Sequence, residues 1–268
     1  MKLIPWECFD EIEAYTTCAY DDFHNIMDMS FHNENNQKVL KNRETLAKQL
    51  HTDLNHMVAT FQQHTTNFKE VTYLDGGKGM YTRDDAFIGY DAMYTRDKHL
   101  WLWTFHADCC PVLLYCRDQG IVAAIHSGWK GTVGEIVKKV TQHLIQEEKC
   151  LPKHIYAYIG PSINQENFEA KDDIIDLVKQ MSFDTSSFYI KKEDGAYLLN
   201  SKGLIKQQLL NLGVKEEHIT VSPYCTIKDE DLFFSYRRDK SPHRNITPVS
   251  YTHLDVYKRQ ILYHKFPL

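Results

Sequence analysis

The sequence predicts a single α+β domain in which mixed strands alternate with helices. The chain has 268 residues, of which 43% are apolar, so it can bury a sizeable core. Short apolar runs typical of buried strands recur between segments with the periodicity of amphipathic helices. No internal repeat and no Ser-, Gly- or Pro-rich linker separates these segments, which favours one domain over two.

The first half of the chain predicts one helix followed by strands. Residues 38–50 place apolar side chains on one side of a helix, and residues 57–61 form a short apolar run typical of a strand. Residues 99–116 (HLWLWTFHADCCPVLLYC) predict a strand, a sharp turn near residues 107–109 and a second strand over residues 112–115.

The second half predicts alternating strands and helices. Residues 121–126 (IVAAIH) are typical of a buried strand. A helix should begin at Thr132, because Thr132 and Glu135 match the capping-box pattern. The remaining expected elements are a strand at 154–160, helices at 171–181 and 201–213, and a strand at 219–225. Gly213 should close the second of these helices.

Composition excludes several classes of protein. The net charge of -5 argues against a general nucleic-acid binder, which is usually basic. The N-terminal residues do not resemble a secretory signal, and no run of about 18 apolar residues predicts a membrane span. The seven cysteines are an odd number with irregular spacing, which is unlike a disulfide framework. We therefore expect a cytoplasmic protein whose cysteines are free, buried or metal-bound.

The C-terminal residues carry a different signal. Residues 249–260 (VSYTHLDVYKRQ) can be back-translated into DNA that is almost wholly its own reverse complement. Such DNA resembles the joined transposon ends of some sequencing libraries. We therefore interpret residues 249–268 as a non-native tail and residues 1–248 as the catalytic domain.

Three donor side chains lie at the ends of expected strands. His64 follows the apolar run 57–61, Cys109 lies in the turn between two strands, and His126 ends the next strand. Three protein ligands with an open fourth position are typical of catalytic zinc. Spacing alone supports this weakly, since neither a C-x-x-C nor an H-E-x-x-H motif is present. Buried His and Cys are common without metal, and a Cys109 nucleophile with His126 as its base is an alternative.

An ordered set of motifs points to one family. The strings HADCCPVLLY, IHSGWKG, IGPSI and FSYRRD, with the earlier Asn42–Arg43 pair, QQH and YDAMYT, occur between residues 28 and 239. Together they resemble the YfiH-like family, also called the laccase-domain or multicopper polyphenol oxidase family. The resemblance implies mixed sheets layered with helices as α/β/β/α, and His64, Cys109 and His126 as metal ligands.

The chain also departs from the family pattern. His106 stands where Thr is usual before the A-D-C motif, and it could orient a ligand or replace one. Ser162 stands where many relatives have Cys. The family strand that normally follows YRRD should be displaced by the tail.

The donor set favours zinc over copper. A laccase combines a blue-copper Cys–His₂ site with a three-copper cluster supplied by many His, yet no H-x-H pair occurs in this chain. One Cys and two His suit a single zinc ion better, with copper as the alternative.

The resemblance implies purine nucleoside phosphorolysis. In this reaction adenosine, inosine or 5′-methylthioadenosine reacts with phosphate to give the base and ribose 1-phosphate or its methylthio analogue. Adenosine deamination is a second implied activity. The alternatives are a copper polyphenol oxidase, a Cys/His hydrolase of cell-wall precursor peptides, and a metal-storage or partner-binding module without turnover.

This chemistry requires an anion site. Lys130, with the backbone amides of Gly131 and Thr132, lies at an expected helix N-terminus, which favours phosphate. Three arginines could add bidentate contacts or only form surface ion pairs. They are Arg43, Arg237 and Arg238.

Two further residues could contact the nucleoside. Asp108, beside Cys109, could act as a general acid or base, or could only cap the turn. Trp129 could stack on a base or simply pack. The expected partners are a nucleoside and phosphate, without nucleic acid or membrane, and no sequence device distinguishes a monomer from a homodimer.

Overall fold

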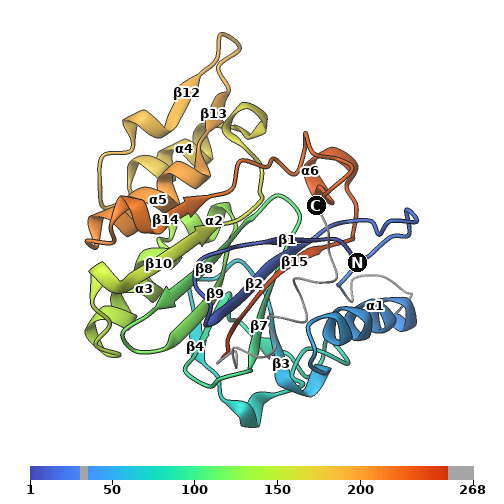
Figure 1. Cartoon of the computed structure of the whole chain (residues 1–268). Helices are drawn as coiled ribbons and strands as arrows, with labels where there is room; N and C mark the ends of the chain where they lie inside the picture. Colours follow the sequence, from blue (N-terminus) through green and yellow to red (C-terminus); the bar gives the residue numbers. More distant parts are fainter. Residues whose placement is uncertain (31–35, 253–268) are drawn as a thin grey trace.

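Two six-stranded sheets pack face to face in the computed structural model, which describes residues 1–30 and 36–252 (Figure 1). The first sheet has the order β1-β2-β15-β7-β3-β5. Its strands are β1 (Leu3–Pro5), β2 (Ile12–Thr17), β15 (Asn245–Tyr251), β7 (Trp101–His106), β3 (Met57–Phe61) and β5 (Phe87–Ile88). Strand β15 is antiparallel to both of its neighbours, β2 and β7.

The second sheet has the order β14-β10-β8-β9-β6-β4. Its strands are β14 (Ile219–Val221), β10 (Ile155–Ile159), β8 (Cys110–Cys116), β9 (Ile121–Ser127), β6 (Ala92–Thr95) and β4 (Phe68–Glu70). Side chains of β9 alternate between two cores. Val122 and Ala124 face the first sheet, whereas Ile121, Ala123 and Ile125 face helices. Both faces are therefore buried, which explains the continuous apolar run in the sequence.

Helices cover the two outer faces. Helix α1 (Asn36–Gln49) packs Leu46 and Ala47 on the first sheet. Helices α3 (Ile136–Gln146) and α5 (Ser201–Asn211) cover the second sheet. The result is the α/β/β/α layering that the family resemblance implies, so the predicted fold is confirmed.

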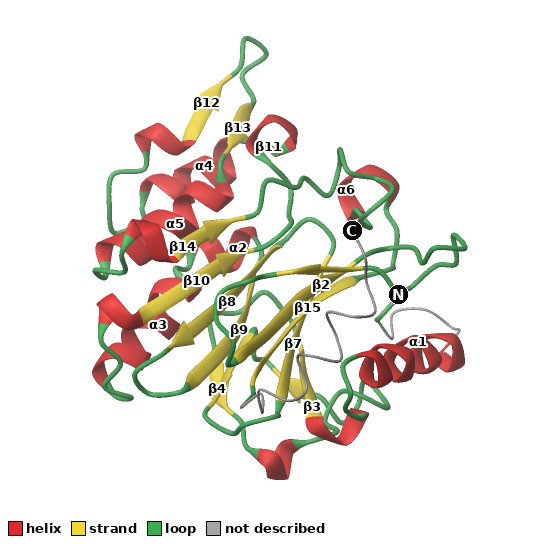
Figure 2. Ribbon diagram, in the orientation of Figure 1, coloured by secondary structure: helices red, strands yellow, loops and turns green. Residues whose placement is uncertain are grey.

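A small third sheet lies beside α5 (Figure 2). It has the order β11-β13-β12, with β11 (Glu169–Ala170), β13 (Tyr197–Leu199) and β12 (Tyr189–Lys191). Helix α4 (Asp172–Lys179) packs with it around its own apolar cluster. Throughout residues 1–30 and 36–252, every helix is too short or too polar to span a bilayer.

The predicted capping box is wrong. A short helix, α2 (Trp129–Val133), begins before Thr132, and α3 begins only after Glu135. Glu135 adopts a left-handed conformation with φ 57°, and its carboxylate accepts from Ser182 and Lys138. The contact with Ser182 comes from another segment and replaces the local cap, and the left-handed backbone at Glu135 separates α2 from α3.

Strand β15 crosses the boundary that the sequence indicated between residues 248 and 249. The family strand that should have been displaced is therefore present. Val249 is fully buried and pairs with Ala14 of β2 and Leu102 of β7. Most of the segment interpreted as non-native, residues 253–268, lies outside the described residues, so the origin of the tail stays a prediction.

Candidate metal centre

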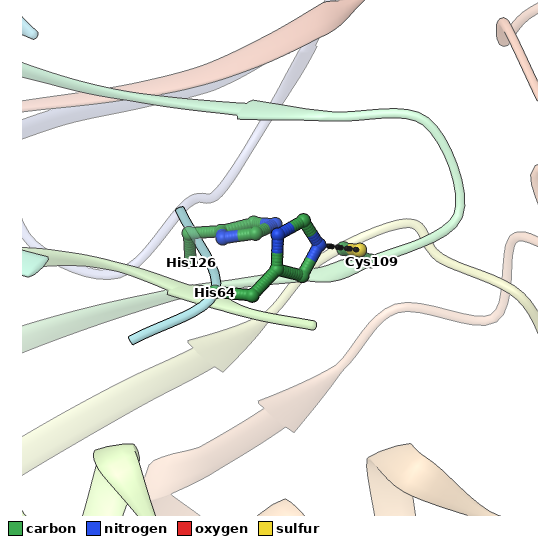
Figure 3. A group of neighbouring side chains, drawn as sticks. All are labelled: His64, Cys109 and His126. Atoms are coloured by element: carbon green, nitrogen blue, oxygen red, sulfur yellow. Dashed lines mark hydrogen bonds between the residues drawn. The ribbon is translucent and has the colours of Figure 1, made fainter. Parts of the chain in front are cut away.

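Three side chains from separate segments converge between the sheets (Figure 3). His64 follows β3 with φ 61°, Cys109 ends the turn between β7 and β8, and His126 lies on β9. One donor atom of each lies within 4.8 Å of the others. Cys109 Sγ is 3.7 Å from His64 Nε2, and the two imidazole rings are nearly perpendicular at 81°.

Asp91 holds both histidines, and sequence reasoning did not identify it. Its carboxylate, which has no exposed surface, accepts from His126 Nδ1 at 2.8 Å and from the backbone amide of His64 at 2.9 Å. It also accepts from the amides of Gln63 and Thr65 and from the Thr65 hydroxyl. His126 Nδ1 is thus occupied, which leaves Nε2 for a metal. The segment YDAMYT, which contains Asp91, was the available signal.

Gly128 provides space for the cluster. A Cβ atom at this position would lie 2.6 Å from His64 Cδ2 and 3.1 Å from Cys109 Sγ. Only a residue without a side chain therefore lets these two donors approach each other.

Electrostatics favour the thiolate that a metal requires. Burial raises the pKa of Cys109, but the neighbouring His126 and His64 outweigh it and lower this pKa to about 6. Burial lowers the pKa of His126, but Cys109 and Asp91 raise it to about 9. The lowered pKa of Cys109 and the raised pKa of His126 both favour a thiolate beside an imidazolium, and the thiolate is the form that binds metal.

A cavity of about 850 Å³ opens over the cluster. This volume is in the range of small-molecule sites. Five aromatic side chains line it, and five cations join them, of which Arg43 and Arg237 were expected at the site. The aromatic residues are Phe61, Phe105, Trp129, Phe168 and Tyr236, and the cations that sequence reasoning missed are Arg83, Lys240 and Arg244, beside Arg237. We found no sequence pattern that marks the three missed cations, because they belong to loops.

Two predicted site residues line the cavity but are engaged elsewhere. Asp108, with φ 97°, accepts from Thr226 Oγ1, Ser235 Oγ and the amide of Arg237. It therefore ties the turn to α6 (Tyr236–Asp239), and its role as acid or base stays a prediction. Arg43 is 1% exposed and donates to backbone carbonyls of residues 29, 79 and 80.

The residues at α2 that the sequence predicts to bind phosphate lie outside this cavity. Lys130 is exposed, with its ammonium 5.6 Å from the Trp129 ring centroid, and neither Lys130 nor Gly131 is among the lining residues. The amide of Thr132 donates to the Gly128 carbonyl at 2.8 Å inside the helix. Arg238 also lies outside the lining and donates to the carbonyls of residues 226, 227 and 233.

The two unusual positions near the centre are buried. His106 is not part of the donor cluster, and its Nε2 lies 2.9 Å from Thr247 Oγ1. Burial lowers the pKa of His106 to about 3, so the ring is neutral. Ser162 Oγ contacts Cys110 Sγ at 3.1 Å.

The sequence and the fold have known counterparts. A family model described as multi-copper polyphenol oxidoreductase laccase matches residues 17–249, and the chain belongs to this family. It is 34% identical over 202 residues to purine nucleoside phosphorylase YlmD of Bacillus subtilis, covering 75% of this chain and 73% of that protein. A purine nucleoside phosphorylase of Bacteroides thetaiotaomicron is 29% identical over 224 residues, 82% of each chain.

Two solved structures have the same fold. The crystal structure of the Bacillus licheniformis hypothetical protein YfiH has a TM-score of 0.89 at 29% identity, covering 92% of this chain and 96% of that one. YlmD of Geobacillus stearothermophilus has a TM-score of 0.86 at 29% identity, covering 91% and 93%.

Proposed function

We propose that this chain is a zinc-dependent purine nucleoside phosphorylase that acts on adenosine, inosine and 5′-methylthioadenosine. The observation that carries the proposal is the convergence of one thiolate and two imidazoles beneath a cavity lined by aromatic rings and cations. The relatives named as purine nucleoside phosphorylases supply the substrate class.

The donor set fits zinc. With ordinary Zn–S and Zn–N bond lengths, two ligands of a tetrahedral ion stand about 3.6 Å apart. Cys109 Sγ and His64 Nε2 are 3.7 Å apart. Within residues 1–30 and 36–252, no second group of His, Cys, Asp or Glu could hold a metal. This counts against the several copper ions of a laccase.

The phosphorolysis needs little covalent chemistry from the protein. A phosphate oxygen attacks C1′ of the ribose, the C1′–N9 bond breaks with its electron pair on the purine, and the base takes up a proton. Aromatic side chains such as Trp129 and Phe168 would stack on the purine, and cations would hold the phosphate. A bound zinc ion would supply Lewis acidity, and adenosine deamination would be the second activity of this centre.

Product analysis by mass spectrometry tests the proposal. The full chain, metal-stripped or restored with zinc, is incubated with each nucleoside, with and without phosphate. We expect phosphate-dependent base and ribose 1-phosphate, or its methylthio analogue, only with zinc. Inosine as the sole product from adenosine would indicate a deaminase, and no release from any nucleoside would contradict the proposal.

The same sample separates the other candidates. Phenol oxidation after copper loading would favour the oxidase. Cleavage of cell-wall precursor peptides by metal-free protein would favour Cys109 as a nucleophile with His126 as base. Native mass spectrometry of the sample distinguishes a monomer from a homodimer.

A further inference from the structure

One wall of the cavity carries three cations without acidic partners. Arg237, Lys240 and Arg244 all line the cavity. Within the described ranges, none of the three forms an ion pair with an Asp or Glu. The nearby carboxylate of Asp108 accepts from the hydroxyls of Thr226 and Ser235 and from the backbone amide of Arg237. Among the described residues, this wall therefore carries three positive charges that have no direct ion pair, with the Asp108 carboxylate as the acidic group in the same lining.

Arg244 is held rigidly in this wall. Its backbone amide donates to Asp28 Oδ1 at 2.9 Å, and its carbonyl accepts from the amide of Met29 at 3.3 Å. Its Nη1 donates to the carbonyls of Ser241 and His243 at 2.9 and 2.8 Å. These contacts fix both the backbone and one side of the guanidinium.

The other side of the guanidinium is available. Nε and Nη2 of Arg244 have no hydrogen-bond partner among residues 1–30 and 36–252. These two nitrogens form the edge of a guanidinium that presents two parallel N–H groups, which match two oxygens of one anion. The side chain is thus prepared to bind an oxyanion without reorganising.

Lys240 adds a second charge at the same place. Its ammonium lies 4.9 Å from the ring centroid of Tyr236, and the guanidinium carbon of Arg244 lies 5.9 Å from the same centroid. Two cations therefore gather around one aromatic ring at the cavity wall. Mutual repulsion of such a pair decreases when a dianion binds between them.

We propose that Arg244 and Lys240 form an oxyanion subsite that binds inorganic phosphate. This inference rests on the proposed phosphorylase function and specifies where its second substrate binds. The Nε and Nη2 groups of Arg244 would donate to two phosphate oxygens, which leaves another oxygen to attack C1′. Arginine keeps its proton at physiological pH, so the subsite supplies charge and orientation without proton transfer.

The experiment compares two lysines that are chemically matched. Lys240 and Lys130 are both exposed and both lie near an aromatic ring, but only Lys240 lines the cavity. Lys240→Gln, Lys130→Gln, Arg244→Gln and Arg244→Lys are made in the full zinc-loaded chain. Steady-state kinetics then give KM separately for phosphate and for nucleoside, and zinc content and Tm are measured for each variant.

We expect the phosphate KM to rise about tenfold to a hundredfold in Arg244→Gln, because charge-assisted hydrogen bonds are lost. It should rise severalfold in Lys240→Gln and change less than about twofold in Lys130→Gln. In Arg244→Lys the phosphate KM should lie between those of wild type and Arg244→Gln, because a lysine keeps the charge but lacks the two parallel donors. Nucleoside KM and zinc content should stay within about twofold of wild type.

The outcomes separate the inference from the proposed function. Unchanged phosphate KM in Arg244→Gln and Lys240→Gln, with an active wild type, overturns the subsite and leaves the function intact. A phosphate KM that rises only in Lys130→Gln also overturns it. If Arg244→Gln does not fold, the comparison of Lys240→Gln with Lys130→Gln decides.

A phosphate-binding measurement tests the subsite even if the wild type has no phosphorylase activity. If the wild type releases no base, the proposed function fails, and ³¹P NMR titration with inorganic phosphate alone tests the subsite. Binding that weakens in Lys240→Gln but not in Lys130→Gln supports it. An adenosine 5′-monophosphate arm identifies the source of the anion, since weakened binding of this nucleotide alone would overturn the assignment to inorganic phosphate.

Discussion

Replacing Asp91 with Asn should weaken zinc binding, because Asp91 accepts hydrogen bonds from both His126 and His64. The two carboxylate oxygens of Asp91 accept from different groups. Oδ1 accepts from His126 Nδ1 and the His64 amide, and Oδ2 accepts from Gln63 and from two groups of Thr65. An amide keeps one oxygen and places an NH₂ group at the other position. The orientation that leaves fewer donors unpaired puts the NH₂ toward His126 and His64.

This orientation of the substituted side chain determines the expected loss of stability and of zinc affinity. The part-buried His64 amide loses its acceptor, at about 1–3 kcal/mol, so we expect about 1–3 kcal/mol less unfolding free energy in the metal-free protein. His126 would then accept at Nδ1 and carry its proton on Nε2, the nitrogen that a metal needs. Zinc affinity should therefore fall about tenfold to a hundredfold.

The assay is a zinc titration against a chromogenic chelator, together with urea unfolding of the metal-free protein. Asp97→Asn is the matched control, because Asp97 follows the other end of β6 and accepts from the Tyr73 amide at 2.7 Å, away from the cluster. Zinc affinity within about twofold of wild type in Asp91→Asn would refute the orienting role of Asp91.

Three further predictions follow from the same contacts. Gly128→Ala should lower zinc affinity more than about tenfold with unchanged circular dichroism, since its Cβ would lie 2.6 Å from His64 Cδ2; full zinc content would contradict this. In metal-free protein, iodoacetamide should modify Cys109 with a half-maximal rate near pH 6, because the thiolate forms above its lowered pKa, and zinc should protect it; a midpoint near pH 9 would be the opposite result. A chain ending at Pro248 should have a Tm more than about 5 °C below that of one ending at Thr252, because Val249 is fully buried; equal Tm values would show that this part of β15 is dispensable.

Elements that depend on local patterns were predicted well. The strand Met57–Phe61 and the turn before Cys109 follow directly from apolar runs and their interruption. The donor set rests on the family resemblance, because spacing along the chain does not show that three strand ends meet.

Features that depend on contacts between distant segments were not predicted. Arg43 reads as a surface cation in sequence, yet carbonyls of residues 29, 79 and 80 surround it in the fold. Asp91 acts on residues 63–65 and on His126, so no local motif describes its role. The Glu135 carboxylate accepts from Ser182, a residue far along the chain, instead of capping its own helix.

The position of β15 has a consequence for how the protein folds during synthesis. This strand follows every other described strand in sequence, yet it lies between β2 and β7, and Thr247 contacts Thr16 across 231 residues (Figure 1). The first sheet therefore cannot close until nearly all of the described chain has left the ribosome. The donors at positions 64, 109 and 126 emerge much earlier than residues 237–244. The three donors are thus synthesised before the charged wall that we assign to phosphate, and the edges of β2 and β7 that pair with β15 stay open in the interval.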